Sequence, residues 1–168
     1  MSEYFWAKTT KNGEPGKSVL SHMRDVRAVA DVLLAGKASF LRLQQTERNV
    51  FSCFAGLHDI GKISPGFQSK CKGWLQQNNL IETAKNCAWD ATYESDHSSV
   101  SQYTIQTILQ KSEMRTESAE LWGALVGAHH GRFHKLGIIP RGCKPDDEWA
   151  KCREKTIGDF LGSITLPD

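Results

Sequence analysis

The sequence lacks the features that mark membrane and exported proteins. It has no apolar run approaching the about 18 residues that a transmembrane helix needs. Its N-terminal end has no charged leader followed by an apolar stretch. The five cysteines are odd in number and none forms a CxxC pair, so neither a disulfide framework nor a zinc ribbon is indicated. We therefore expect reduced thiols, a cytoplasmic location and no membrane partner.

Strand patterns, internal repeats and low-complexity tracts are also missing. The 168 residues, of which 39% are hydrophobic and 24% charged, suit one domain over residues 1–168, with a monomer as the default. A net charge of +2 is too small to indicate nucleic-acid binding by itself. Two stretches, 60–80 and 131–145, nevertheless contain basic residues and no acid, which favours a polyanionic substrate.

Apolar residues recur at helical spacing along most of the chain, which predicts an all-α bundle of about six or more helices. Gly36 is expected to end the first helix, and Pro65 to begin the third. The stripes that should face the core include Leu33 and Leu125. Residues 78–94 are expected to be mostly loop. The predicted helices span residues 18–36, 46–58, 65–75, 95–109, 117–130 and 146–161.

The most informative motif is the run Leu57–Lys62, which places an imidazole, a carboxylate and an ammonium at an expected helix end. Five of the six histidines lie at or beside the apolar stripe of a predicted helix, so they should point inward. A single histidine in such a place is more often a packing residue than a ligand. Five of them together with one Asp favour a metal site between helices. His134 lacks such placement, and we expect it to lie on the surface or in a substrate-binding loop. The candidate ligands are His22, His58, Asp59, His97, His129 and His130.

These ligand types indicate one or two divalent transition-metal ions. Imidazole with carboxylate suits Mn, Fe, Co, Ni or Zn, whereas Mg prefers more oxygen ligands. Asp59 could bridge two ions about 3.5–4 Å apart, which would activate a water and hold the phosphate that it attacks. Lys62 is expected to be catalytic, neutralising a phosphoryl oxygen. Arg132 and Lys135 in the basic stretch are expected to bind DNA phosphates.

The motif His58-Asp59-Ile60-Gly61-Lys62 resembles that of the HD superfamily of metal-dependent phosphohydrolases, which are all-α proteins. The fuller order of motifs is similar to the HD nuclease domain of the CRISPR type I interference nuclease-helicase. Softer similarities are Phe5-Trp6-Ala7-Lys8 near the start and Phe67-Gln68 after the HD motif. The order of motifs is His22, then His58-Asp59-x-Gly-Lys, then His97, then His129-His130-Gly131.

The resemblance implies a two-metal nuclease that degrades single-stranded DNA beside a helicase domain or subunit. A crRNA-guided surveillance complex would first open the duplex. One ion would be held by His22, His58 and Asp59. The other would be held by Asp59, His97, His129 and His130. Lys62, Arg132 and Lys135 would contact the DNA.

The sequence departs from this family in two ways. It contains no GxxxxGK[ST] phosphate loop, so we expect either a separate nuclease subunit or a piece of a longer protein without its helicase. The family also supplies a late Asp to the first ion. No Asp of this chain stands in a matching setting, so the C-terminal part of the domain is expected to be missing and the first ion to bind more weakly. The available residues are Asp146, Asp147, Asp159 and Asp168.

Two rival interpretations remain. One is an HD phosphohydrolase that acts on nucleotides. The His129-His130 doublet and the basic stretches favour DNA as the substrate over such a small molecule. The other is a catalytically incomplete HD module that docks on a helicase or surveillance complex. The intact ligand set disfavours this module, whereas the missing late Asp favours it.

Overall fold

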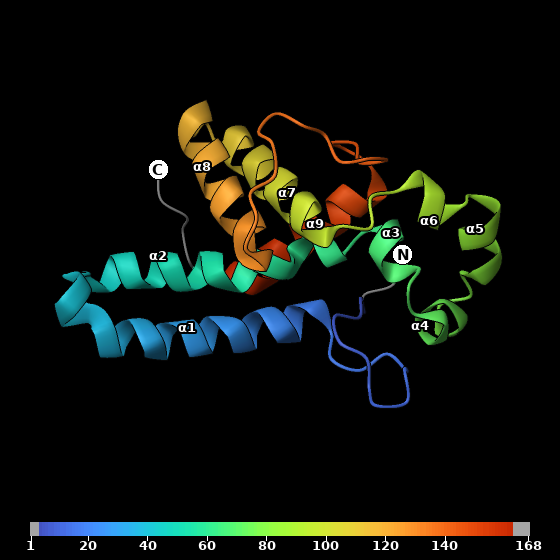
Figure 1. Ribbon diagram of the computed structural model, residues 1–168, viewed down its shortest axis with the longest axis horizontal. Helices are drawn as coiled ribbons and strands as arrows, with labels where there is room; N and C mark the ends of the chain where they lie inside the picture. Colours follow the sequence, from blue (N-terminus) through green and yellow to red (C-terminus); the bar gives the residue numbers. More distant parts are fainter. Residues whose placement is uncertain (1–3, 163–168) are drawn as a thin grey trace.

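The structure is a computed structural model that describes residues 4–162, apart from the side chains of residues 38 and 39. Two helices, α1 (Val19–Leu41) and α2 (Gln45–Gly56), form an antiparallel hairpin. The pair formed by α7 (His97–Lys111) and α8 (Thr116–Gly127) lies at a steep angle to this hairpin (Figure 1). Within residues 4–162 the β structure is limited to two isolated bridges. The predicted all-α class is confirmed.

The remaining elements are short, except for α9. The segment 78–94, expected to be mostly loop, contains two helices, so that prediction is wrong. These helices form because each buries an apolar side chain, Ala84 in one and Trp89 in the other. The predicted third helix breaks after one turn, although Pro65 does begin it. The elements are η1 (Leu57–Lys62), α3 (Pro65–Gln68), α4 (Lys72–Gln77), α5 (Ile81–Asn86), α6 (Trp89–Thr92), η2 (Ala128–His130) and α9 (Glu148–Leu161).

Helix α1 is longer than predicted. Gly36 does not end it, because a glycine costs a helix interior only about 1 kcal/mol relative to alanine. The helix ends at Leu41, where Arg42 adopts a left-handed conformation (φ 55°). Leu33, predicted to face the core, is 63% exposed because the hairpin extends beyond the rest of the body. None of the described helices combines the length and apolar character needed to cross a bilayer.

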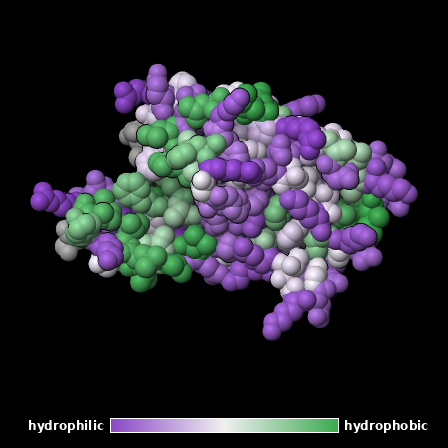
Figure 2. Space-filling model, viewed as in Figure 1, coloured by the Kyte–Doolittle hydropathy of each residue, from purple (hydrophilic) through white to green (hydrophobic). Residues whose placement is uncertain are grey.

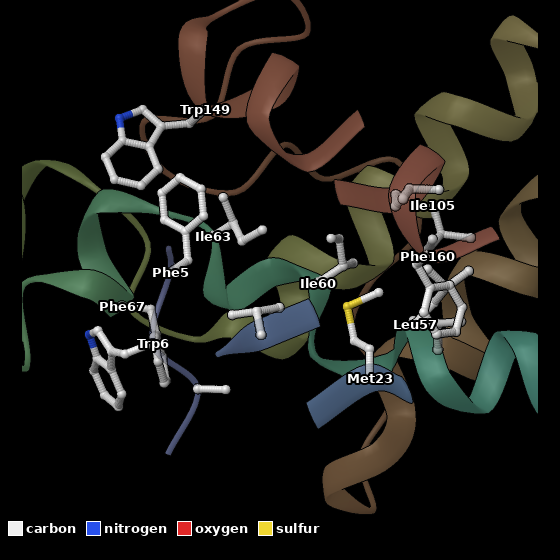
Figure 3. Packing of buried hydrophobic residues seen from close by; sticks show 14 of the residues in the cluster. Phe5, Trp6, Met23, Leu57, Ile60, Ile63, Phe67, Ile105, Trp149 and Phe160 are labelled. Carbon is white, nitrogen blue, oxygen red and sulfur yellow. The ribbon is translucent and has the colours of Figure 1, made fainter. Parts of the chain in front are cut away.

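The hydrophobic core surrounds η1. Leu57 and Ile60 of this short helix are fully buried, and they meet Met23 from α1 and Phe160 from α9 (Figure 3). The 3-10 segment is therefore a central element, and its position depends on packing from several directions.

Gly61 allows η1 to lie directly against α7. A Cβ atom at Gly61 would lie 2.0 Å from the His97 carbonyl oxygen and 2.5 Å from the Ser101 backbone nitrogen. The Ser101 hydroxyl accepts the Gly61 N–H at 2.9 Å and donates to the His58 carbonyl at 2.7 Å. Ser101 thus satisfies two backbone groups of η1 that would otherwise be buried without partners.

We predict that Gly61→Ala lowers the free energy of unfolding by about 3 kcal/mol or more, the upper end of what overpacking costs. The atoms in the way belong to the backbone, so they cannot move aside as a side chain can. Gly36→Ala is the matched control, because nothing lies within 4 Å of its added methyl group. It should stabilise α1 by up to about 1 kcal/mol. Urea unfolding of both variants checks this, and equal stabilities would contradict the close approach.

Candidate metal centre

Asp59, in η1, lies at the centre of the site and is 2% exposed. Its Oδ2 atom lies 3.0 Å from Nε2 of His22 and 3.1 Å from Nε2 of His58. Its Oδ1 atom lies 3.0 Å from Nε2 of His97 and 3.6 Å from Nε2 of His129. The two carboxylate oxygens therefore face different pairs of histidines.

His97, His129 and His130 form a group of their own beside Asp59. Nε2 of His97 lies 3.3 Å from Nε2 of His129 and 3.1 Å from Nε2 of His130. In this group, and in the other one around Asp59, the ligand atoms lie within 4.8 Å of one another. The six residues predicted as ligands thus come together from α1, η1, α7 and η2, in the expected division. That they bind metal stays a prediction.

Hydrogen bonds to the backbone fix the tautomer of two histidines. Nδ1 of His58 lies 2.9 Å from the Ala55 carbonyl oxygen, and Nδ1 of His129 lies 2.9 Å from that of Val126. A carbonyl oxygen only accepts, so Nδ1 donates in both rings and carries the proton. In the neutral ring, Nε2 then presents a lone pair toward Asp59, as it does in metal-binding histidines.

This donor set fits a cation. Lone pairs on Nε2 of His58 and His129 face an ionised carboxylate, and this repulsion is relieved when positive charge lies between them. Nε2 of His97 carries at most one proton in the neutral ring, yet three potential acceptors surround it. Two nitrogens bound to one ion at about 2.0–2.1 Å are separated by about 3.0–3.4 Å. The spacings of 3.1 and 3.3 Å around His97 match that separation.

The protonation states also suit metal binding. Burial lowers the pKa of His97, and it lowers the pKa of His129 to about 4, so both rings are neutral at neutral pH. Burial alone would raise the pKa of Asp59. A hydrogen bond from His97 and the charge of Lys62 oppose that effect, and the pKa of Asp59 lies well below its usual range. The carboxylate is therefore ionised despite its burial.

Lys62 lies deeper than the sequence led us to expect. It is 5% exposed, and its ammonium donates to Oδ2 of Asp59 at 2.6 Å and to the Ala7 carbonyl at 3.3 Å. Burial lowers the pKa of Lys62, and the charge of Asp59 opposes this. The ammonium thus forms a buried ion pair with Asp59. The expected contact of Lys62 with a phosphate or with DNA stays a prediction.

Gln68 ties the N-terminal segment to Lys62. This side chain is fully buried, and its amide donates to the carbonyls of Trp6 at 3.0 Å and Lys62 at 2.8 Å. Its oxygen accepts the Trp6 backbone N–H at 3.2 Å, and the Trp6 indole donates to the Gln68 carbonyl at 3.2 Å. These bonds hold the Ala7 carbonyl beside Lys62. Residue spacing does not predict this role, because a glutamine side chain is mostly exposed to solvent.

The basic loop that follows η2 is fastened to the start of α7. Arg132 pairs with Asp96, and Nε2 of His134 lies 2.7 Å from the Ser98 hydroxyl. The Arg132 side chain is still 66% exposed, and Lys135 is exposed as well. The two loop residues predicted to bind DNA therefore lie on the surface next to the metal centre, whereas His134 holds the loop in place.

No further carboxylate joins the ligand groups within residues 4–162. Asp146 pairs with Lys111, and Asp147 caps the start of α9. Asp159 lies in α9 outside both groups. Asp168 lies outside the described residues. The group around Oδ2 therefore has three described ligands, His22 and His58 with Asp59 itself.

Comparison with known proteins relates the chain to one family. A family model described as "Cas3, HD domain" matches residues 6–163. The CRISPR-associated endonuclease/helicase Cas3 of Thermus thermophilus is 27% identical over 135 residues. That match covers 75% of this chain and 14% of the length of the relative. No solved structure matches the chain.

We predict that Gln68→Met weakens Mn²⁺ binding about 10-fold, at the low end of what partners outside the ligand shell contribute. The apolar side chain removes the amide hydrogen bonds that place the Ala7 carbonyl beside Lys62. Isothermal titration calorimetry on folded protein measures this effect. In a Lys62→Met background the same change should have little further effect, because Gln68 acts through that ammonium.

Trp74→Phe is the matched control for the loss of the Gln68 hydrogen bonds to the N-terminal segment. It removes a different bond to the N-terminal segment, from the Trp74 indole to the Tyr4 carbonyl at 2.7 Å. Unchanged Mn²⁺ affinity is expected for it. Equal losses in Gln68→Met and Trp74→Phe, or fully additive losses with Lys62→Met, would show that Gln68 has only a structural role.

Proposed function

The chain belongs to the Cas3 HD-domain family, and on that premise we propose that it is a metal-dependent nuclease that cleaves single-stranded DNA during crRNA-guided CRISPR interference. Membership makes the chain one of the CRISPR-associated HD nucleases, as the motif resemblance predicted. The finer proposal depends on one observation. The two oxygens of the buried Asp59 carboxylate face two separate groups of histidines.

In this proposal the Asp59 carboxylate would be shared by two divalent ions. Bound ions would supply Lewis acidity and an activated water for attack on the phosphodiester. The imidazole-rich set favours Mn, Fe, Co or Ni, permits Zn and disfavours Mg. The ligands of one ion would be His22, His58 and Asp59, and those of the other would be Asp59, His97, His129 and His130.

Lys62 would be a positioning residue in this mechanism. Its ammonium contacts one carboxylate oxygen of Asp59 and leaves the other free to face His97. This contact holds the carboxylate in the orientation that bridging needs, and it offsets part of the buried negative charge. The Ala7 carbonyl accepts a hydrogen bond from a second N–H of the ammonium and so limits its movement.

The basic loop after η2 would bind the DNA backbone. Arg132 and Lys135 are exposed there, and His130, the last residue of η2, belongs to one ligand group. A single strand that follows this loop could bring its phosphates to the metal centre, where the two groups would hold one of them. Positive charge near the site, in a chain of small net charge, suits a polyanion that is bound locally.

The partners follow from the relative and remain part of the proposal. The name of this relative joins an endonuclease to a helicase, and the match spans 14% of its length. We assign the chain a helicase domain or subunit as partner, which would deliver single-stranded DNA. A crRNA-guided surveillance complex would open the duplex for that helicase.

We predict that Asp59→Asn lowers Mn²⁺-dependent cleavage of a single-stranded oligonucleotide at least about 100-fold, since even residues that only support a metal ligand contribute 10- to 100-fold. Bound Mn²⁺, counted by elemental analysis, should fall as well. Asp159→Asn is the matched control, because this carboxylate lies outside both groups. Its cleavage rate should equal that of the wild type.

The same assay separates the rival functions. Hydrolysis of nucleotides without cleavage of oligonucleotides would replace the nuclease by an HD phosphohydrolase for small substrates. Metal binding without either activity would instead identify a module that docks on a helicase or surveillance complex. Full cleavage by Asp59→Asn would contradict the metal centre itself.

We predict that Arg132→Ala and Lys135→Ala each weaken binding of single-stranded DNA. Each should reduce the slope of log affinity against log salt by about 0.7, the value for one phosphate contact on a single strand. Metal content should stay unchanged. Lys37→Ala removes an exposed lysine of α1 and serves as control. Fluorescence anisotropy measures the affinity at each salt concentration. If the slope of log affinity against log salt is equal in all three variants, the loop does not contact the DNA.

A further inference from the structure

A cavity of about 470 Å³ opens between α1, α2 and α8, beside the metal centre. Two of its lining residues, His58 and His129, belong to different ligand groups around Asp59. The volume lies within the range of small-molecule sites, which are mostly apolar with a few polar groups. The cavity is lined by Val26, Phe51, Phe54, Ala55, His58, Trp122, Leu125, Val126 and His129.

The cavity offers aromatic surface. The ring of Trp122 is stacked on Phe54, with centroids 4.1 Å apart and planes 12° apart. Phe51 lies at the rim, 41% exposed, with its ring centroid 5.9 Å from that of Trp122. Leu125, predicted to face the core, is 49% exposed beside them. Figure 2 shows the hydrophobic surface that continues from α8 over the hairpin of α1 and α2.

The chemistry of the lining separates two parts of a nucleotide. No Asp, Glu, Lys or Arg lines the cavity, so nothing there would hold a phosphate by charge. The two histidines at its edge belong to the groups proposed to hold the ions that bind the phosphate. A nucleobase is flat, largely apolar on its faces and attached to its phosphate through one sugar. The nucleobase is therefore the part of a bound nucleotide that suits an aromatic cavity beside the metal centre.

We propose that this cavity binds the nucleobase next to the scissile phosphate of single-stranded DNA, with Phe51 and Trp122 as the surface on which it stacks. This inference rests on the proposed nuclease function of the metal centre. A base must leave its own stack to enter the cavity, so the subsite favours single strands over duplexes. Stacking tolerates any base, which gives binding without a marked sequence preference.

The exposed apolar surface also extends beyond the cavity. Val29 and Leu33 of α1 are 60% and 63% exposed, and they continue toward the end of the hairpin. A second copy of the chain could cover them. The cavity itself is distinguished from that surface by the two metal-centre histidines in its lining.

The proposal is tested by measuring how Mn²⁺-loaded protein binds phosphorothioate oligonucleotides, which resist cleavage. One oligonucleotide has all its bases, and a second has the same backbone without bases. Phe51→Ala should weaken binding of the first about 5- to 100-fold, the range for loss of one stacked base, and leave binding of the second unchanged. Phe51→Tyr should retain the wild-type affinities because it keeps the aromatic face.

Phe40→Ala is the matched control, since Phe40 is 84% exposed near the end of α1 and outside the cavity. It should bind both oligonucleotides as the wild type does. Equal affinity of wild type and Phe51→Ala for the oligonucleotide with bases would overturn the subsite. A wild-type dimer that Phe51→Ala dissociates, with DNA affinity unchanged, would overturn it in favour of a second copy. Wild-type protein that binds neither oligonucleotide would refute the proposed function itself.

Discussion

The structure depends on one buried carboxylate. Asp59 is almost inaccessible to water, and an ionised group in such a place is costly unless positive charge and hydrogen-bond donors compensate it. Lys62 supplies one positive charge, whereas the His97 and His129 rings are neutral at neutral pH and supply none. The hydrogen bonds of Nδ1 in His58 and His129 turn the Nε2 lone pairs of the neutral rings toward the carboxylate, so cations between them would complete the site. This demand for positive charge is the physical reason to regard the cluster as a metal centre.

The fold around Asp59 holds that arrangement in place. Gly61 lets η1 approach α7, and Ser101 satisfies the backbone groups that this approach buries. Backbone carbonyls orient the rings of His58 and His129 by accepting from Nδ1. Ligands from four elements can be positioned within a few tenths of an ångström only because the core around η1 is tightly packed.

Sequence reasoning was most successful where chemistry and helical spacing agree. His97 lies in the first turn of α7 and points at Asp59, as its place beside the apolar stripe predicts. It failed where tertiary packing decides. Leu33 carries the same periodic signal as buried Met23, yet it lies beyond the body that would cover it. The buried contacts of Lys62 likewise could not be predicted, since a lysine at a helix end is normally solvated.

The most direct test is a crystal structure of Mn²⁺-loaded protein, with anomalous difference maps recorded at the manganese edge. We expect two peaks, one on either side of the Asp59 carboxylate and about 3.5–4 Å apart. One peak should lie within reach of His22 and His58, and the other within reach of His97. A single peak would contradict the bridging carboxylate, whether that ion contacts both oxygens of Asp59 or neither of them.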